Sequence, residues 1–258
     1  MSIQQQISQK ILLVGDSCLD YYHFGTCERI SPEAPVPVIK QTKVEVRNGM
    51  SLNVKSNLES FGLTVTHLTN EKMIEKRRIV DMKSNYQICR LDINESSVLD
   101  QIDTKYIDSS NYDCLVISDY NKGVVSEGVV KYLCDTFKSK PIFVDSKKKD
   151  LSIFENCIVK INEAEFKSSN SLPVNSEVIV TMGSKGALYN SKIYETNKVE
   201  VFDVCGAGDV FLSALVFCFL KTKSLETSIH YANNLASRSV TKMGTYVLTK
   251  EDIDDFCI

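Results

Sequence analysis

The stretch DVCGAGDVF, residues 203–211, places two glycines and a carboxylate at the entrance of a run, 210–220, that contains no charged residue. If that run is a buried helix, its N-terminus presents unpaired N–H groups and the positive end of the helix dipole, which suits a phosphate. Gly206 and Gly208 would let the anion approach without a Cβ in the way. Asp209 is a carboxylate that could take the proton from an attacking hydroxyl. Taken alone, such a tetrad is more often a helix cap with incidental glycines.

The composition is that of a soluble globular protein, with 258 residues, 43% hydrophobic and 24% charged. The length is enough for a sizeable core, and we expect one domain over 1–258. A net charge of −3 gives no electrostatic argument for nucleic acid or an anionic membrane. The first ten residues lack the apolar segment of a secretory signal, and no uncharged run is long enough to span a bilayer. We therefore expect a cytoplasmic protein that binds neither nucleic acid nor membrane.

The nine cysteines are scattered without a CxxC pair, and none of the three histidines lies near a cysteine cluster. This spacing argues against a zinc site. We interpret the cysteines as buried free thiols of a reducing cytosol.

Short β-branched segments alternate with helical patterns along the chain. The expected strands are 11–15, 64–68, 114–118, 141–145, 157–161 and 178–181. Several are apolar throughout, as strands covered on both faces are. The expected helices are 53–61, one capped by Ser126, the apolar run after Asp209, and one capped by Ser224 that ends at Gly244. The alternation predicts an α/β fold with a mostly parallel sheet between two helical layers.

Two segments interrupt this alternation. Residues 19–48 contain RISPEAPVPVIK, whose prolines exclude a helix and favour extended edge strands. Residues 76–93 have the pattern of a hairpin with its turn near 83–86. Together they predict a small second sheet that acts as a lid over the main one.

Several motifs, in order from about residue 11 to the C-terminus, are similar to the ribokinase-like (PfkB) carbohydrate kinases. The family signature D-T-x-G-A-G-D before an apolar helix resembles 203–209. Within the family, the chain most resembles the kinases that phosphorylate D-glycero-D-manno-heptose 7-phosphate at C1. That resemblance is carried by GDSCLDYYHFGTCERISPEAPVPVIK (15–40), QICRLD (87–92), SDYNKG (118–123), VDSKKKD (144–150) and EVFDVCGAGDVF (200–211).

The resemblance implies a three-layer α/β/α ribokinase-like fold with a β-lid, and it implies ATP and Mg²⁺ as cofactors, with a monovalent cation as a further candidate. Asp209 matches the catalytic base, and Gly206, Ala207 and Gly208 match the anion hole for the transferred phosphoryl group. NEAE matches N-x-x-E, so Asn162 and Glu165 would organise Mg²⁺ through water, although alone it is typical of a helix start. The other nucleotide-side matches, each with an ordinary turn, helix or surface-charge alternative, are Asp145, Lys147, Thr181, Gly183, Gly186 and Asn233.

On the sugar side, the resemblance implies that Asp20 holds substrate hydroxyls and that Gly49 and Asn53 follow the lid. A sugar phosphate needs cations, since guanidinium groups bind phosphate in a bidentate way. Each candidate cation is individually more often a surface residue; the candidates are Arg29, Arg47, Arg90 and Lys122. Open lid edges favour a homodimer that pairs the lids.

The chain departs from the family at several positions. Of the family's double glycine only Gly49 is kept, with Asn48 and Met50 beside it, and the threonine expected before the tetrad is Cys205. We expect the helix and strand that the family places after residue 68 to be missing, and we expect no nucleotidyltransferase domain of the kind that related heptose enzymes often carry. A kinase for another sugar, or a degenerate kinase fold used for binding or regulation, is the alternative function. A Rossmann oxidoreductase is disfavoured because the dinucleotide fingerprint is absent.

Overall fold

The computed structural model describes residues 8–95 and 102–256, and Cys257 lies outside them. An eight-stranded sheet has the order β12-β11-β10-β9-β8-β7-β1-β4. Its parallel strands are β4 (Thr64–Leu68), β1 (Lys10–Gly15), β7 (Cys114–Asp119), β8 (Ile142–Ser146), β9 (Ile158–Asn162) and β10 (Glu177–Thr181). β11 (Ala187–Tyr189) and β12 (Lys192–Tyr194) continue it as an antiparallel hairpin. All six strands expected from the sequence are confirmed.

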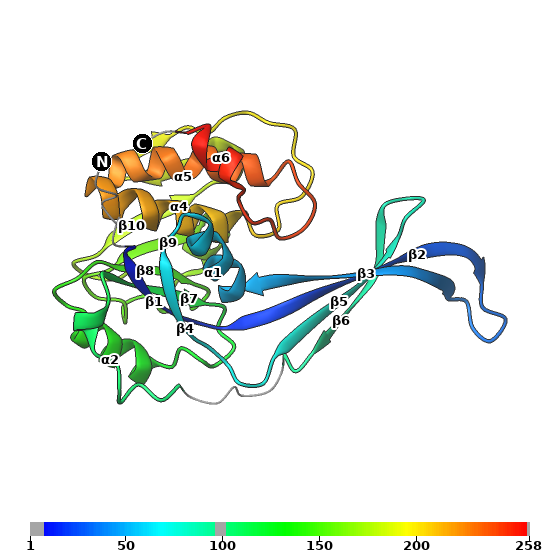
Figure 1. The fold of residues 1–258 in the computed structure, drawn as a ribbon, viewed down its shortest axis with the longest axis horizontal. Helices are drawn as coiled ribbons and strands as arrows, with labels where there is room; N and C mark the ends of the chain where they lie inside the picture. Colours follow the sequence, from blue (N-terminus) through cyan, green and yellow to red (C-terminus); the bar gives the residue numbers. More distant parts are fainter. Residues whose placement is uncertain (1–7, 96–101, 257–258) are drawn as a thin grey trace, which may run out of the picture.

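Helices cover both faces of this sheet, as Figure 1 shows. Alternate residues of β1 separate the two cores: Ile11 and Leu13 pack with α1 (Ser51–Ser60), α4 (Ala207–Thr222) and α5 (Leu225–Ser239), and Leu12 and Val14 pack with α2 (Glu127–Thr136). The remaining helices are short: α3 (Glu163–Ser168), α6 (Lys250–Asp254), η1 (Ser109–Asn111) and η2 (Gly183–Lys185). The expected three-layer α/β arrangement is therefore confirmed.

A separate four-stranded sheet projects from the main one and forms the lid (Figure 1). Its order is β3-β2-β5-β6, with β2 Ser17–Ile30, β3 Pro37–Met50, β5 Ile74–Asp81 and β6 Tyr86–Ile93. The strands extend the expected segments by about two residues, and Pro37 begins an edge strand, where a missing N–H costs least. β2 follows β1 after a single residue, so the lid emerges from the carboxyl edge of the main sheet.

One local expectation was wrong in detail, and one departure from the family has a structural consequence. Helix α5 ends at Ser239, not at Gly244, because the Val240 carbonyl accepts the N–H groups of Phe202 and Asp203 instead of continuing the helix. Met50 has φ 54° and ψ −135°, a conformation that glycine adopts far more easily than a side chain does. The chain thus keeps the glycine-like backbone at the lid hinge without the glycine.

The missing segment after residue 68 leaves β4 as an edge of the main sheet, and the chain passes directly from there into β5.

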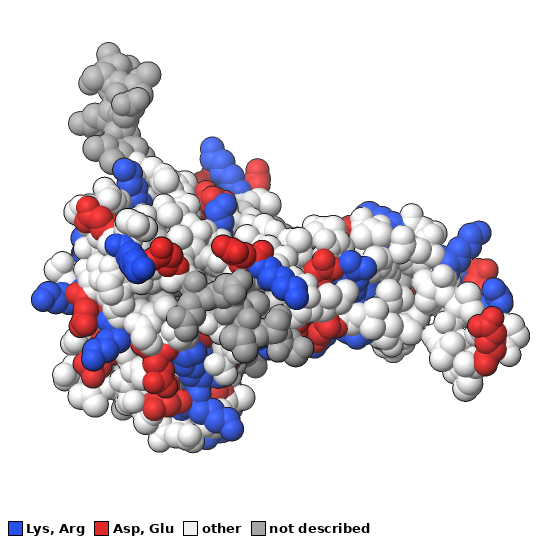
Figure 2. Space-filling view, turned by 90° about the horizontal axis from the view of Figure 1, so that it is seen from below, with Lys and Arg blue, Asp and Glu red and all other residues white. Residues whose placement is uncertain are grey.

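Of the eight described cysteines, all are free thiols, but Cys89 is exposed and Cys27, Cys134 and Cys205 are only partly buried, so the expectation of uniformly buried thiols was wrong. In the described part of the chain, no helix combines the length and apolar character needed to cross a membrane. On the face drawn in Figure 2, acidic and basic side chains are interspersed and neither sign forms a continuous patch.

Candidate active site

The carboxyl ends of the parallel strands open onto one cavity of about 810 Å³. Small-molecule sites commonly measure ~300–1,000 Å³ and lie at this edge of open α/β sheets. Every catalytic and nucleotide-side residue expected from the sequence lines it: Gly206, Ala207, Gly208, Asp209, Asp145, Lys147, Asn162, Glu165, Thr181, Gly183, Gly186 and Asn233.

Asp209 is buried in the first turn of α4 and is held at both carboxylate oxygens. Asn53 Nδ2 donates to Oδ2 at 2.9 Å, and the Tyr120 hydroxyl donates to Oδ1 at 2.8 Å. Burial raises the pKa of Asp209 to about 6, helped by the charge of Asp145 and opposed by the Asn53 and Tyr120 hydrogen bonds. A general base works best when its pKa lies near the operating pH, so this carboxylate is suited to accept a proton.

The loop before α4 packs against Asn53, which holds this carboxylate. Gly206 is the N-cap residue in the left-handed region, with φ 77°, and a Cβ there would lie 2.8 Å from Asn53 Nδ2. Asp203 fixes the loop, since its side chain accepts the N–H groups of Cys205 at 2.9 Å and of Gly244 at 2.8 Å. The N-terminus of α4 therefore faces the cavity in a fixed position.

Lys160 was missed by the sequence analysis. It lies on β9 with 4% of its surface exposed, and its ammonium is 2.6 Å from Asp145 Oδ2 on the neighbouring strand β8. The signal was a lysine inside the apolar segment CIVKI, where an unpaired charge would be costly. Both residues of this ion pair line the cavity.

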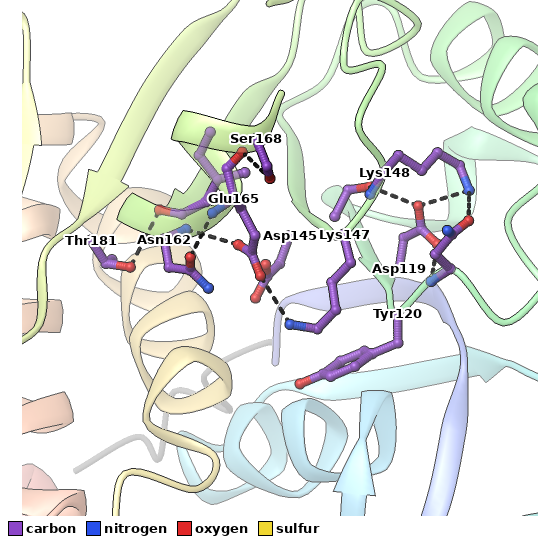
Figure 3. A network of polar contacts seen from close by, with 12 residues as sticks. Asp119, Tyr120, Asp145, Lys147, Lys148, Asn162, Glu165, Ser168 and Thr181 are labelled. Atoms are coloured by element: carbon purple, nitrogen blue, oxygen red, sulfur yellow. Dashed lines mark hydrogen bonds and ion pairs between the residues drawn. The ribbon is translucent and has the colours of Figure 1, made fainter. Parts of the chain in front are cut away.

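Asn162 and Glu165 form a capping box at the start of α3. Asn162 Oδ1 accepts the N–H of Glu165 at 2.9 Å, and Glu165 Oε2 accepts the N–H of Asn162 at 2.8 Å. Glu165 Oε1 accepts a hydrogen bond from the Lys147 ammonium at 2.9 Å (Figure 3). Burial opposes the charge on Glu165, but Asn162 N–H and Lys147 outweigh it and hold its pKa below the usual value. The helix-start interpretation of NEAE is confirmed, and Asn162 and Glu165 also line the cavity.

The far side of the cavity is formed by the 181–186 turn and α5. Gly183 and Gly186 have φ 59° and 91°, and a Cβ on Gly186 would clash with the Tyr194 backbone. Asn233 is buried, not exposed, and its Nδ2 donates to Tyr194 O at 2.7 Å. Asn233 therefore fixes the chain that continues as the 196–201 wall of the cavity.

On the sugar side, Asp20 and Asn53 are buried, and Asn53 contacts Asp209 directly. A Cβ on Gly49 would lie 2.6 Å from Cys18 Sγ and closer still to Asp20 Oδ2, so only glycine fits beside this carboxylate. Arg78 of β5, which the sequence analysis missed, forms an ion pair with Asp20 with only 11% of its side chain exposed.

The four cations that the sequence suggested for a sugar phosphate do not lie together in the structure. Arg47 donates to Met243 O and lies over the Tyr22 ring, next to the Gly244 turn. Lys122 forms an ion pair with Glu95 at 2.6 Å and does not line the cavity. The structure does not bring Arg29 and Arg90 to the cavity: Arg29 is exposed on the outer half of β2, and Arg90 pairs with Asp92 on the edge strand β6.

Two acidic residues that the sequence analysis left out position the loops around the site. Asp16 accepts the backbone N–H groups of Tyr120, Lys122 and Val124 at 2.8–3.1 Å. Asp119 accepts a hydrogen bond from Ser146 Oγ at 2.7 Å and pairs with Lys148 at 3.0 Å (Figure 3). Tyr120 and Lys147 are thereby held together, with the Lys147 ammonium 4.8 Å from the Tyr120 ring centre.

The arrangement of the main sheet and the smaller second sheet is that of the ribokinase fold. Ribokinase from Thermotoga maritima has a TM-score of 0.69 at 16% identity, covering 96% of this chain and 99% of that chain. Phosphofructokinase-2 from Escherichia coli in complex with potassium has a TM-score of 0.73 at 15% identity, covering 96% and 98%. At these identities the likeness shows the fold alone.

Sequence comparison finds similarity to carbohydrate kinases. Residues 153–252 match the model described as pfkB family carbohydrate kinase. The bifunctional protein HldE of a Nitratiruptor species is 31% identical over 300 residues, covering 96% of this chain and 64% of the relative. The protein of the same name from Campylobacter jejuni is 30% identical, covering 97% and 65%. The chain is thus similar to the pfkB family carbohydrate kinases over residues 153–252, and to these HldE proteins over nearly its whole length.

The chain spans just under two thirds of the length of these curated relatives. The first alignment runs over 300 positions, more than the 258 residues of the chain, so the relative contains stretches that this chain lacks. This agrees with the trimmed segment after β4.

Proposed function

We propose that the protein transfers the terminal phosphate of ATP to a hydroxyl of a sugar phosphate. The observation that carries this proposal is the position of Asp209: a buried carboxylate, with a pKa raised by burial to about 6, at the N-terminus of a helix that opens onto the cavity. A carboxylate beside a phosphate site weakens anion binding. It is useful there only when a hydroxyl must be deprotonated. A binding protein would have no need of it.

In this proposal Asp209 is the general base. Asn53 and Tyr120 hold its two oxygens, and burial raises the pKa of the Tyr120 hydroxyl well above its usual value, so that group remains a donor. The N–H groups at the start of α4 face the transferred phosphoryl group and stabilise its charge. The 181–186 turn and Asn233 form the nucleotide end of the cavity.

The donor set fits Mg²⁺ bound with a nucleotide. Mg²⁺ in such sites keeps several waters and needs only one or two carboxylates, and Glu165 provides a charged carboxylate on the cavity wall. Bound Mg²⁺ would neutralise charge on the phosphate oxygens. The capping box fixes the direction of the Glu165 side chain, and Lys147 forms an ion pair with its carboxylate.

The proposed acceptor is D-glycero-D-manno-heptose 7-phosphate, phosphorylated at C1 to the 1,7-bisphosphate. The resemblance of residues 29–38 and 118–123 to heptose 7-phosphate kinases supports this choice, and the relatives at 30–31% identity share one name. Asp20 would hold sugar hydroxyls beside Asp209. Arg47 and Arg78, which are adjacent to this end of the site, give cationic groups for the acceptor's phosphate.

A homodimer through the lid is part of the proposal. One row of side chains, Val46, Tyr21, Arg77 and Leu91, crosses all four lid strands on the face opposite to Asp20. Val46 and Leu91 are 52% and 55% exposed, and the next row adds exposed Val44. A second lid would cover this apolar surface.

The enzyme would act in the cytoplasm, where ATP and sugar phosphates are available. A monovalent cation is a further candidate cofactor, since phosphofructokinase-2 from Escherichia coli was solved in complex with potassium. Activity in potassium and in tetramethylammonium salts tests this part of the proposal.

The experiment is an ADP-release assay with ATP and a panel of acceptors, with and without Mg²⁺. We expect Mg²⁺-dependent turnover with kcat/KM at least about tenfold higher for heptose 7-phosphate than for hexose phosphates, ribose or fructose. Higher turnover on a neutral sugar overturns the acceptor. Nucleotide binding without turnover on any acceptor favours the binding or regulatory alternative, which the trimmed segment supports.

A further inference from the structure

Lys160 occupies a position that stability does not explain. Its strand, β9, is buried between α-helical layers, and Lys160 is its one charged residue. The ion pair with Asp145 is almost fully buried, with side-chain exposures of 5% and 10%. Buried ion pairs are commonly no more stabilising than apolar residues of similar size. A lysine retained here at this cost suggests a role for its charge.

The geometry shows where that charge is directed. A Cβ on Gly208 would lie 2.8 Å from Lys160 Nζ and 3.9 Å from Asp145 Oδ2. The ammonium therefore lies against the first turn of α4, beside the helix N–H groups that have no partner within the helix. Only the absence of a side chain at Gly208 leaves room for it. A phosphate bound at this helix end would meet backbone N–H groups and the ammonium together.

Lys147, the other lysine near Asp145, does not duplicate this arrangement. Its ammonium pairs with Glu165 and lies over Tyr120, and 43% of its side chain is exposed. The two lysines thus approach the cavity from different walls. Of the two, it is Lys160 that lies against the glycine loop in front of Asp209.

We propose that Lys160 is a catalytic residue that binds the terminal phosphate of ATP, exchanging Asp145 for the phosphoryl oxygens. This inference rests on the proposed function and adds a residue to it. During transfer the acceptor oxygen bonds to the terminal phosphorus, the bond from that phosphorus to the bridging oxygen breaks, and ADP leaves with the electron pair. The acceptor's proton goes to Asp209, and Lys160 remains protonated throughout.

Nucleotide titration of the full chain with Mg²⁺ tests this assignment, using ADP and a β,γ-imido analogue of ATP. In Lys160→Met we expect analogue affinity to fall roughly 10–100-fold, the usual effect of losing a charged hydrogen bond, while ADP affinity changes less than about threefold. Lys160→Arg should restore part of the difference. Lys167→Met, which removes a lysine 70% exposed on α3, is the matched control and should change neither affinity.

Lys160→Met leaves Asp145 buried without its partner, so folding is monitored by thermal melting. The double variant Asp145→Asn, Lys160→Met removes the unpaired charge and should show the same selective loss of the analogue. Equal loss of ADP and analogue affinity in the folded double variant, or no loss of either, overturns the assignment to the terminal phosphate. A wild-type protein that binds neither nucleotide instead refutes the proposed function, and the inference with it.

Discussion

Asn53 Nδ2 lies 2.9 Å from Asp209 Oδ2, although 156 residues separate them in the chain. Asn53 is in the first turn of α1, which begins directly after the lid strand β3, and Asp209 is in the first turn of α4. The lid hinge is therefore hydrogen-bonded to the proposed base. A change in the lid that moves α1 would alter both the position and the pKa of that carboxylate.

Asp209→Asn should abolish most turnover while leaving ATP affinity nearly unchanged. An amide has the same shape but cannot accept the acceptor's proton, and a positioned base contributes about 10²–10⁴-fold to such a step. Steady-state kinetics with nucleotide titration measure the two effects separately. A variant that retains more than about a tenth of wild-type kcat would show that Asp209 is not the general base.

The kcat/KM profile should rise with pH through about 6, because burial raises the pKa of Asp209 to that value and only the ionised form accepts a proton. The Tyr120 hydroxyl lowers this pKa by donating at 2.8 Å. Tyr120→Phe should therefore move the acidic limb to higher pH. If the acidic limb of the Tyr120→Phe profile is unchanged, that limb reports the ionisation of a group other than Asp209.

Asp209→Asn should also change how stability depends on pH. Because the pKa of Asp209 is raised in the folded protein, folding favours the protonated form, and its contribution is complete below about pH 4 and is lost as pH rises through about 6. The asparagine is always neutral, so the variant should be more stable than wild type at pH 7.5, by on the order of 3 kcal/mol. Denaturant unfolding at pH 5 and pH 7.5 measures this; a difference that does not shrink at the lower pH contradicts it.

Gly49→Ala should raise the KM for the sugar and leave nucleotide affinity intact. The added methyl group would overlap Asp20 Oδ2 and displace this carboxylate, while the nucleotide end of the cavity is formed by other elements. Gly128→Ala is the matched control, because a Cβ there, on α2, meets nothing within 4 Å. If the two substitutions change the KM for the sugar equally, Asp20 is not part of the acceptor site.

Val46→Glu should convert a lid-paired dimer to a monomer, because it replaces an exposed apolar side chain by a charge that the proposed interface would bury. Val174→Glu alters a valine that is 66% exposed outside the lid and should leave the oligomeric state unchanged. Sedimentation or light scattering measures the oligomeric state of both variants. A wild-type protein that is monomeric at micromolar concentration would refute the lid interface.

Much of the fold follows from patterns that span only a few residues. The six strands of the parallel sheet, the Ser126 and Ser224 caps and the lid hairpins were all predictable, because β-branched runs, capping side chains and prolines act on their immediate neighbours. The end of α5 was not predictable, since the Val240 carbonyl is taken by residues nearly 40 positions earlier in the chain.

The sequence by itself determined the glycine-rich entrance to α4, the capping box of NEAE and the presence of a lid, because each is encoded within a local segment. Only the tertiary structure decided which side chains meet. Strand order and register place Lys160 against Asp145, and Asp16 under the 120–124 loop, and they turn Arg78, not its neighbour Arg77, toward Asp20. Arg29 and Arg90 do not reach the cavity, because Arg29 lies near the outer end of β2 and Arg90 lies on the edge strand β6. A one-residue change of register exchanges the two faces of a strand, so these contacts depend on the folded sheets and not on any motif.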